Sequence, residues 1–185
     1  MSMFPQKKLA NFTVPHNRAN FVGDTWLSVG ARPEDFTLEE IKKSAPSLII
    51  SLEEKEPWYL GKIQSNIIHI PTATGKPPRK DQAEKAVKEA IDVLEKGGHV
   101  FVHCTGGHGR AGTLAALIYG KWKKVDAAKA IEVVSKSKEN RKDTSRNFIP
   151  SPETNAQVRF LEKELGGTGP DRSDMSWLRL SRGKK

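Results

Sequence analysis

Short apolar runs alternate along this chain with longer stretches in which apolar residues recur every three or four positions. Runs rich in β-branched and aromatic residues predict buried strands, and they occupy residues 21–22, 26–29, 47–52, 66–70 and 100–102. The helical spacing predicts amphipathic helices, and it occurs over residues 37–43, 82–96, 113–119, 127–135 and 151–165. This alternation predicts an α/β fold, with a central, mostly parallel, twisted sheet covered by helices on both faces.

Some of the predicted helices carry residues that favour a helix start. Thr37, with Glu40 three residues later, has the pattern of a capping box. Asp126 has a side chain suited to an N-cap. Ser151 and Pro152 predict the start of the last helix, with the proline at its first position.

The most informative stretch covers residues 98–120, with the sequence GHVFVHCTGGHGRAGTLAALIYG. It predicts a strand that passes through a glycine-rich turn into a helix. Such a turn directs backbone N–H groups and the positive end of the helix dipole toward one place, which suits a phosphate dianion. Cys104 enters this turn and Arg110 leaves it. A cysteine in these surroundings is held as a thiolate.

The spacing of Cys104 and Arg110 suits phosphoryl transfer. Five residues between them can curl around a tetrahedral anion and donate their amides to its oxygens. The guanidinium of Arg110 can form two parallel hydrogen bonds to those oxygens, and the thiolate can attack phosphorus in line to form a phosphocysteine. The alternative is a buried structural cysteine followed by an unrelated arginine. The agreement of strand, glycines, arginine and helix favours the phosphate site.

The segment from His103 to Arg110 resembles the HCxxGxxR signature of the cysteine-based protein tyrosine phosphatases, and the short chain is similar to their dual-specificity branch. The resemblance extends loosely over about residues 20–165. It implies that Cys104 is the nucleophile and that Arg110 clamps the transition state. It also implies a structural role for His103 and a reaction without metal or organic cofactor. The phosphate would be bound by the amides of Thr105, Gly106, Gly107, His108, Gly109 and Arg110.

The resemblance weakens at the general acid. Relatives carry an aspartate on a loop about thirty residues before the cysteine, and Thr74 stands there in this chain. Asp81 is the nearest carboxylate, but its place favours a cap on the helix that begins near Gln82. Three interpretations stay open: Asp81 swings in, the leaving group needs no help, or the domain mainly binds phosphate. By analogy, Gln157 could position the hydrolytic water.

Two further positions near the signature have alternative interpretations. His108 either adds a titratable positive group at the pocket mouth or is a solvated loop histidine. Ala111 stands where most relatives carry serine or threonine, so a hydroxyl donor is missing there. His103, Cys104 and His108 share one tight loop and lack further ligands, so we expect no metal site.

Length and composition bound the organisation of the chain. At 185 residues it suits one α/β domain over residues 20–167, which the resemblance makes a phosphatase domain of the dual-specificity type. We expect an extended arm over residues 1–19 and a disordered basic tail over residues 168–185. No apolar run approaches a membrane span, and the single cysteine suits a reducing compartment. We therefore expect a monomer in the cytoplasm or nucleus.

The net charge of +9 favours anionic partners. Five basic residues fall within residues 136–146, in a segment that either contacts substrate or is a solvated connection. The basic tail could contact nucleic acid or an anionic membrane. We predict a hydrolase of phosphotyrosine, phosphoserine and phosphothreonine proteins. The alternatives are a phosphatase of phosphoinositide, RNA 5′-phosphate or phosphoglucan, and a weakly active pseudophosphatase that binds phosphate.

Overall fold

The computed structural model describes residues 12–178 of the 185-residue chain. Its strands are β1 (Ala19–Phe21), β2 (Leu27–Ala31), β3 (Leu48–Ser51), β4 (Asn66–His69) and β5 (Val100–Cys104). Its helices are α1 (Leu38–Ser44), α2 (Lys80–Glu95), α3 (Arg110–Lys123), α4 (Ala127–Ser137) and α5 (Asn155–Leu165), with the 3₁₀ turns η2 (Asp35–Thr37) and η3 (Lys138–Asn140). The order of strands and helices is the one that the apolar pattern predicts.

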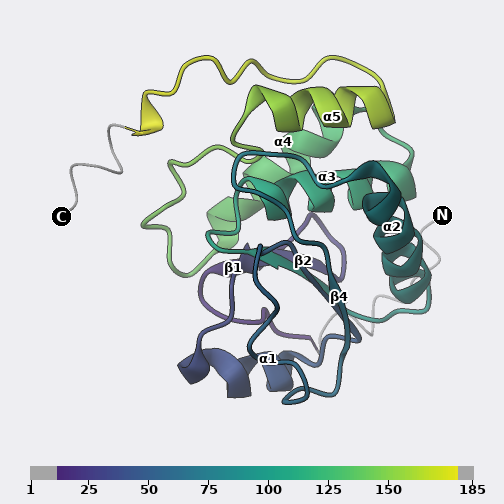
Figure 1. Ribbon diagram of the computed structural model, residues 1–185, viewed down its shortest axis with the longest axis vertical. Coiled ribbons are helices and arrows are strands. Elements are labelled where there is room, and N and C mark those ends of the chain that lie inside the picture. Colours follow the sequence, from purple (N-terminus) through teal and green to yellow (C-terminus); the bar gives the residue numbers. More distant parts are fainter. Residues whose placement is uncertain (1–11, 179–185) are drawn as a thin grey trace.

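The five strands form one sheet in the order β1-β2-β5-β3-β4. Only β1 pairs antiparallel with its neighbour, and the other pairings are parallel. Helices α2, α3, α4 and α5 lie on one side of the sheet and α1 lies on the other, as Figure 1 shows. The predicted α/β fold with helices on both faces is therefore confirmed, although the two faces are covered very unequally.

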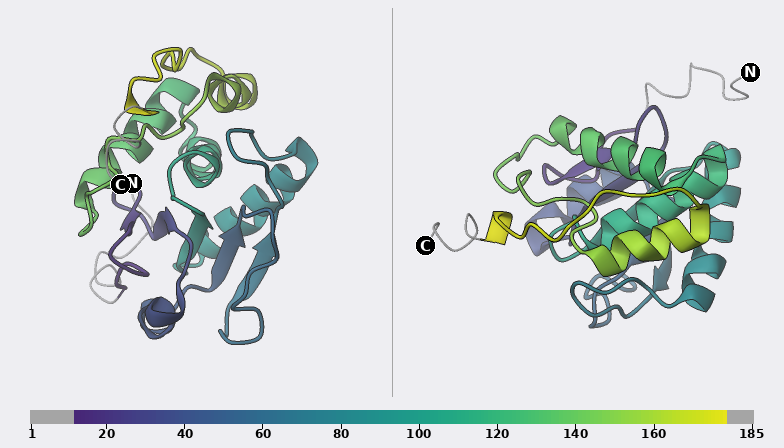
Figure 2. Two further views of the ribbon diagram at one scale, coloured as in Figure 1. Left: turned by 60° about the vertical axis from the view of Figure 1, so that its left-hand side comes forward. Right: turned by 90° about the horizontal axis from the view of Figure 1, so that it is seen from above.

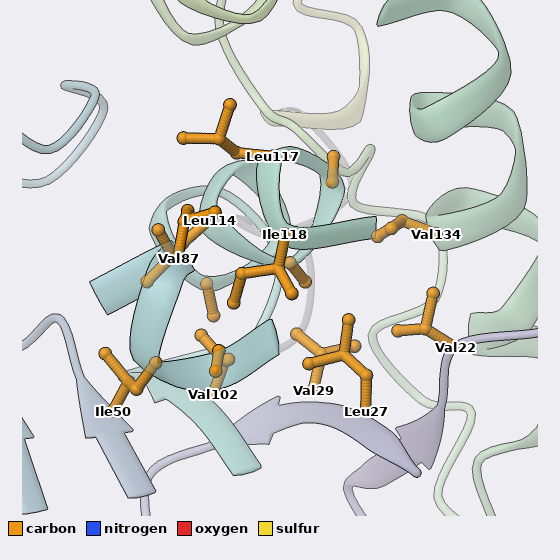
Figure 3. Packing of buried hydrophobic residues seen from close by; sticks show 14 of the residues in the cluster. Val22, Leu27, Val29, Ile50, Val87, Val102, Leu114, Leu117, Ile118 and Val134 are labelled. Atoms are coloured by element: carbon orange, nitrogen blue, oxygen red, sulfur yellow. The ribbon is translucent and has the colours of Figure 1, made fainter. Parts of the chain in front are cut away.

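The side chains of the central strands alternate between two cores, because successive residues of a strand point to opposite faces. Ile50 and Val102 point into the large core, which also holds Leu114 and Ile118 of α3 (Figure 3). Phe101 belongs to the smaller core on the opposite face. Helix α3 lies at the centre of the large core, so the large core fixes the position of its first residue, Arg110.

The strand register brings the signature to the carboxyl edge of the sheet. Cys104 is the last residue of β5 and pairs with Ala31 of β2, while His103 pairs with Ser51 of β3. Strand β5 therefore ends between the carboxyl ends of two parallel neighbours. Ligands of open α/β sheets bind at such a place.

One predicted capping box and one predicted helix start are wrong, although α1 does begin directly after Thr37. The hydroxyl of Thr37 donates to the carbonyl of Glu34 at 2.8 Å and accepts from its N–H at 3.0 Å, so it serves the preceding 3₁₀ turn and not α1. The last helix begins at Asn155 and not at Pro152. Thr154 caps this helix, in a capping box with Gln157, because its hydroxyl accepts the backbone N–H of Gln157. The side chain of Pro152 has no acceptor for such a bond.

Both ends of the described chain contact the domain. His16, within the expected arm, is buried, and its Nε2 donates to the carbonyl of Ala31 at 2.9 Å. After α5, the N–H groups of Gly169 and Arg172 donate to the side chains of Glu162 and Asn155 at 2.7 Å each. This segment runs back along α5 (Figure 2), unlike the disordered tail expected from residue 168. Residues 1–11 of the arm and 179–185 of the tail lie outside the described residues.

Candidate active site

The phosphate loop (residues 105–109) connects β5 to α3 and wraps around the thiol of Cys104. The N–H of Gly107 donates to the Cys104 sulfur at 3.3 Å. Gly107 has a φ of 75°, and a β-carbon there would lie 2.2 Å from the carbonyl carbon of Gly30. Only glycine tolerates both this conformation and this contact. The loop can therefore close tightly over the sulfur.

Several backbone amides of the phosphate loop face no other protein group. Among residues 12–178, no protein acceptor is found for the N–H groups of Thr105, Gly106, His108 and Arg110. Free amides at the start of a helix form a site for an anion. Four of the six amides of the predicted cradle are thus free of other protein groups, and phosphate binding by the cradle stays a prediction.

The guanidinium of Arg110 is buried and fixed from three sides. Its Nη1 donates to the carbonyls of Leu52 at 3.1 Å and Thr72 at 2.9 Å. Its Nη2 donates to the hydroxyl of Thr105 at 2.9 Å. These bonds use three of the five N–H groups of an arginine. The others are available to a phosphate bound above the loop.

His103 supports the loop from below, as the resemblance implies. Its Nε2 lies 2.5 Å from the hydroxyl of Tyr59, so a side chain and not the backbone holds this end of the ring. Burial lowers the pKa of His103 to about 3 and raises the pKa of Tyr59. The imidazole is therefore neutral at physiological pH.

The basic segment 136–146 divides into a buried and an exposed part. The Nη2 of Arg141 donates to the carbonyl of Gly107 at 2.7 Å, and its Nε donates to the side chain of Asn20 at 2.8 Å. Burial lowers the pKa of Arg141 to about 10, while the nearby Cys104 acts in the opposite direction. Arg141 therefore places a buried positive charge against the phosphate loop. The exposed residues are Lys136, Lys142 and Arg146.

His108 is neither a positive group at the pocket mouth nor a solvated histidine. It is buried, and its Nδ1 lies 3.4 Å from the Nζ of Lys138. Burial lowers the pKa of His108 to about 2, and the positive charges of Lys138 and Arg141 add to this. Lys138 is itself buried, with a pKa lowered to about 8 by burial, and it donates to the carbonyl of Ile149. Both interpretations of His108 were wrong.

The position expected for the general acid holds no carboxyl group. Thr74 lines the pocket beside Arg110. Asp81 does not cap α2, which begins at Lys80 and has Arg79 before it. The carboxylate of Asp81 is exposed and lies 3.8 Å from the guanidinium of Arg79. Asp81 is therefore part of the helix surface.

Gln157, suggested as a residue that positions the hydrolytic water, forms three side-chain hydrogen bonds within the described part of the protein, which leave one N–H of its amide unused. It is fully buried, its Oε1 accepts from the N–H groups of Glu153 and Thr154, and its Nε2 donates to the carbonyl of Lys76 at 3.3 Å. Besides Glu53, whose carboxylate accepts from the hydroxyl of Thr105 at 3.2 Å, the carboxyl group next to the phosphate loop is that of Glu153. Its Oε2 lies 3.0 Å from the point where a β-carbon on Gly109 would sit.

Sequence reasoning missed Glu153, Lys138 and Arg141 as individual residues. The buried pair was recognised only as part of a basic run, because nothing local distinguishes a buried arginine from an exposed one. For Glu153 a signal was present: Thr154 and Gln157 have the spacing of a capping box, which places residue 153 just before a helix.

A pocket of about 760 Å³ opens beside the phosphate loop. Among its lining residues are Arg32, Glu34, Asp35, Glu53, Glu54, Lys55, Glu56, Trp58, Lys62, Thr74, Thr105 and Arg110. Glu53 closes one side, because its carboxylate accepts from the hydroxyl of Thr105 at 3.2 Å and lies 3.8 Å from Arg32. The pocket thus joins the anion cradle to a wall of mixed charge.

Neither a metal centre nor a membrane span appears in the part of the chain that the structure describes. Over residues 12–178, no three histidine, cysteine, aspartate or glutamate residues come together as metal ligands. No helix in this range is long and apolar enough to cross a membrane.

The model of the Swiss Army Knife protein, DSP-PTPase phosphatase domain, matches residues 18–159. The chain therefore belongs to this family of cysteine-based, dual-specificity-type phosphatases. No relative among curated protein sequences shows significant similarity to it.

Solved structures share the fold. Tk-PTP in its active form is 20% identical, with a TM-score of 0.67 over 80% of this chain and 96% of its own. PTPMT1 in complex with PI(5)P is 17% identical, with a TM-score of 0.65 over 79% of this chain and 93% of its own. Kinase associated phosphatase, with its catalytic cysteine replaced by serine, is 18% identical, with a TM-score of 0.61 over 76% of this chain and 88% of its own.

Proposed function

We propose that this protein hydrolyses phosphomonoesters through a phosphocysteine on Cys104, and that its substrates are proteins phosphorylated on tyrosine, serine or threonine. One observation carries the proposal. The Cys104 sulfur lies within a closed loop in which the N–H groups of Thr105, Gly106 and His108 are free, next to a fixed arginine. We expect this arrangement to bind a phosphate with its phosphorus in line with the sulfur.

The first step transfers the phosphoryl group to the enzyme. The thiolate attacks phosphorus, the S–P bond forms and the P–O bond to the leaving group breaks. Charge spreads over the equatorial oxygens, where the loop amides and Arg110 stabilise it. In the second step water attacks the phosphocysteine, and the thiolate leaves. Arg141 stabilises that departing charge because it is buried against the phosphate loop, where it donates to the carbonyl of Gly107.

The mixed charge of the pocket wall supports a protein substrate. The wall holds five carboxylates, from Glu34, Asp35, Glu53, Glu54 and Glu56. These repel the additional phosphates of a polyphosphorylated lipid or an RNA chain. Lys55, Lys62 and Trp58 offer complementary contacts to a peptide that flanks the phosphorylated residue. The pocket, with a volume of about 760 Å³, has room for a substrate larger than phenyl phosphate.

A phosphoinositide with a single ring phosphate is the second candidate. The structure of PTPMT1 in complex with PI(5)P shares the fold at 17% identity. Such a lipid has only one monoester, so the carboxylates would repel it less than a polyphosphorylated one.

A comparison of substrates tests the proposal. The full chain is assayed with phosphotyrosine, phosphoserine and phosphothreonine peptides, with PI(5)P in vesicles, and with a 5′-phosphorylated oligonucleotide, each with Cys104→Ser as the background. We expect the highest kcat/KM on phosphopeptides. A higher kcat/KM on PI(5)P or on the oligonucleotide would contradict the protein substrate class. No turnover of any substrate would contradict the enzyme itself.

A further inference from the structure

The proposed chemistry needs a proton for the leaving oxygen, and the expected loop supplies none. Thr74 stands at the position of the acid, and Asp81 is exposed on the surface of α2. An alkoxide or phenoxide is a poor leaving group unless it is protonated as it departs. General acid catalysis contributes about 10²- to 10⁴-fold to such a step. The site is therefore incomplete unless another element provides the group.

Glu153 is a carboxyl group in contact with the phosphate loop. Its Oε2 and Cδ both lie 3.0 Å from the position that a β-carbon on Gly109 would occupy. Glycine at this position leaves the carboxyl room beside the last turn of the loop before Arg110. Glu153 is half-buried, and it forms no ion pair with a lysine or arginine among residues 12–178.

Hydrogen bonds hold the backbone around Glu153 against the turn of residues 74–76, where Thr74 replaces the aspartate of the relatives. The N–H of Glu153 donates to Gln157 at 2.9 Å, and Gln157 donates in turn to the carbonyl of Lys76 at 3.3 Å. The hydroxyl of Thr154 donates to the carbonyl of Gly75 at 2.8 Å. The turn of residues 74–76 and the segment of residues 153–157 are thus hydrogen-bonded to each other, and Glu153 is the carboxylic acid of that segment.

The surroundings of Glu153 favour a group that exchanges protons. Burial raises its pKa, against the positive charges of Arg110 and Lys138 and the N–H of Gly109. Two further charged groups lie close to this segment: Arg172, whose Nε donates to the carbonyl of Pro152 at 2.9 Å, and Asp171, whose carboxylate accepts from the side chain of Asn155 at 3.1 Å. The turn of residues 74–76 adds Lys76, whose side chain is exposed. A carboxyl with a raised pKa keeps its proton nearer to neutral pH.

We propose that Glu153 is the general acid of the first step and the general base of the second, in place of the aspartate that Thr74 replaces. In the first step the leaving oxygen takes the proton of the Glu153 carboxyl as the P–O bond breaks and the S–P bond forms. In the second step the attacking water gives one proton to the Glu153 carboxylate as the S–P bond breaks. The carboxyl is then restored and the thiolate is free. This inference rests on the proposed function of the site.

The dependence of rate on the leaving group tests the proposal. The wild-type chain, Glu153→Gln and the control Asp81→Asn are assayed with a series of aryl phosphates, from phenyl phosphate to the activated 2,4-dinitrophenyl phosphate. Asp81→Asn removes an exposed carboxylate of the same charge that lies outside the site. Vanadate affinity and urea unfolding of each variant report whether the loop and fold are intact. Glu153→Asp keeps the carboxyl group but shortens its reach.

We expect a shallow leaving-group dependence in the wild type and in Asp81→Asn. Glu153→Gln should lose about 10²- to 10⁴-fold of kcat/KM on phenyl phosphate and much less on the activated ester. Its vanadate binding should persist. The protonated acid is required, so kcat/KM of the wild type should fall as pH rises through the pKa of Glu153. That limb should be absent in Glu153→Gln and present, at a lower rate, in Glu153→Asp.

Two results would overturn the assignment. The first is a leaving-group dependence and a basic limb in Glu153→Gln equal to those of the wild type. The second is a steep dependence already present in the wild type, which would mean that no acid acts. Both leave turnover through Cys104 intact. Turnover that survives in Cys104→Ser, or no turnover in the wild type, would instead contradict the proposed function and this inference with it.

Discussion

The hydroxyl of Thr113 donates a 2.7 Å hydrogen bond to the carbonyl of Gly109. A threonine hydroxyl has only one proton to donate. Thr113, one turn into α3, is therefore not a donor to the sulfur of Cys104. Ala111 is fully buried at the same end of the helix and has no donor. The N–H of Gly107 is left as the donor to the sulfur.

Ala111→Ser should speed the second step. A hydrogen bond to a charged group contributes about 1.5–3 kcal/mol, so its absence slows the departure of the thiolate by about 10- to 150-fold. We expect the wild type to accumulate phosphocysteine and to show a burst of product with an activated substrate. Ala111→Ser should raise the steady-state rate and shrink the burst in stopped-flow assays. No burst in the wild type, with an unchanged rate in the variant, would leave Ala111 as packing.

Arg141→Lys should loosen the phosphate loop. The guanidinium spans the carbonyl of Gly107 and the side chain of Asn20, and a single ammonium group cannot reproduce this fork. A buried acceptor left without its donor costs about 1–3 kcal/mol. We expect that loss in urea unfolding, together with weaker vanadate binding. Arg146→Lys makes the same change at an exposed position, and an equal effect of both would contradict a role for Arg141.

Stability should fall as pH decreases from about 7 toward 4. Burial lowers the pKa of His16 and His99 to about 4. Nδ1 of His99 lies 2.9 Å from the Ser44 carbonyl, to which it donates, and Nε2 lies 2.7 Å from the Ser28 hydroxyl, so the neutral ring is satisfied at both nitrogens. The unfolded chain binds protons below about pH 6.5 and the folded chain does not, so acid favours unfolding.

Each such histidine should contribute up to about 1.4 kcal/mol per pH unit within this window. Urea unfolding at pH 7, 6 and 5 measures the slope, and His99→Gln should reduce it by one histidine's share. A free energy of unfolding that stays constant from pH 7 to pH 5 would contradict the buried neutral histidines.

Peroxide should inactivate the enzyme without an internal disulfide, because Cys104 is the only cysteine of the chain. The product is then a sulfenic acid, a sulfenamide or a mixed disulfide with an added thiol, and thiol treatment restores activity. Intact mass spectrometry distinguishes them. Bound vanadate should protect the thiol. A disulfide between two chains would contradict the expectation of a monomer.

The features that could be predicted from the sequence are those formed by residues close to one another in the chain. The strand, the glycine-rich turn and Arg110 are contiguous, so local geometry defines the cradle. The packing stripe of α2 follows from helical spacing. Of the stripe residues Ala83, Ala86, Val87, Ala90, Ile91 and Leu94, all are buried except Ile91, which is half-buried. Contacts between distant segments were not predictable. Arg141 bonds Asn20 across 121 residues, and Glu153 reaches Gly109 only because α5 packs on α3.

The most direct test of the account is the fate of the phosphoryl group on Cys104. Wild-type enzyme is mixed with an aryl phosphate, quenched in acid within the burst phase and digested for mass spectrometry, with Cys104→Ser beside it. The account predicts a phosphorylated peptide that contains Cys104 in the wild type. In Cys104→Ser it predicts no turnover but retained vanadate binding. Turnover by Cys104→Ser, or hydrolysis by the wild type with no phosphate on Cys104 under burst conditions, would contradict it.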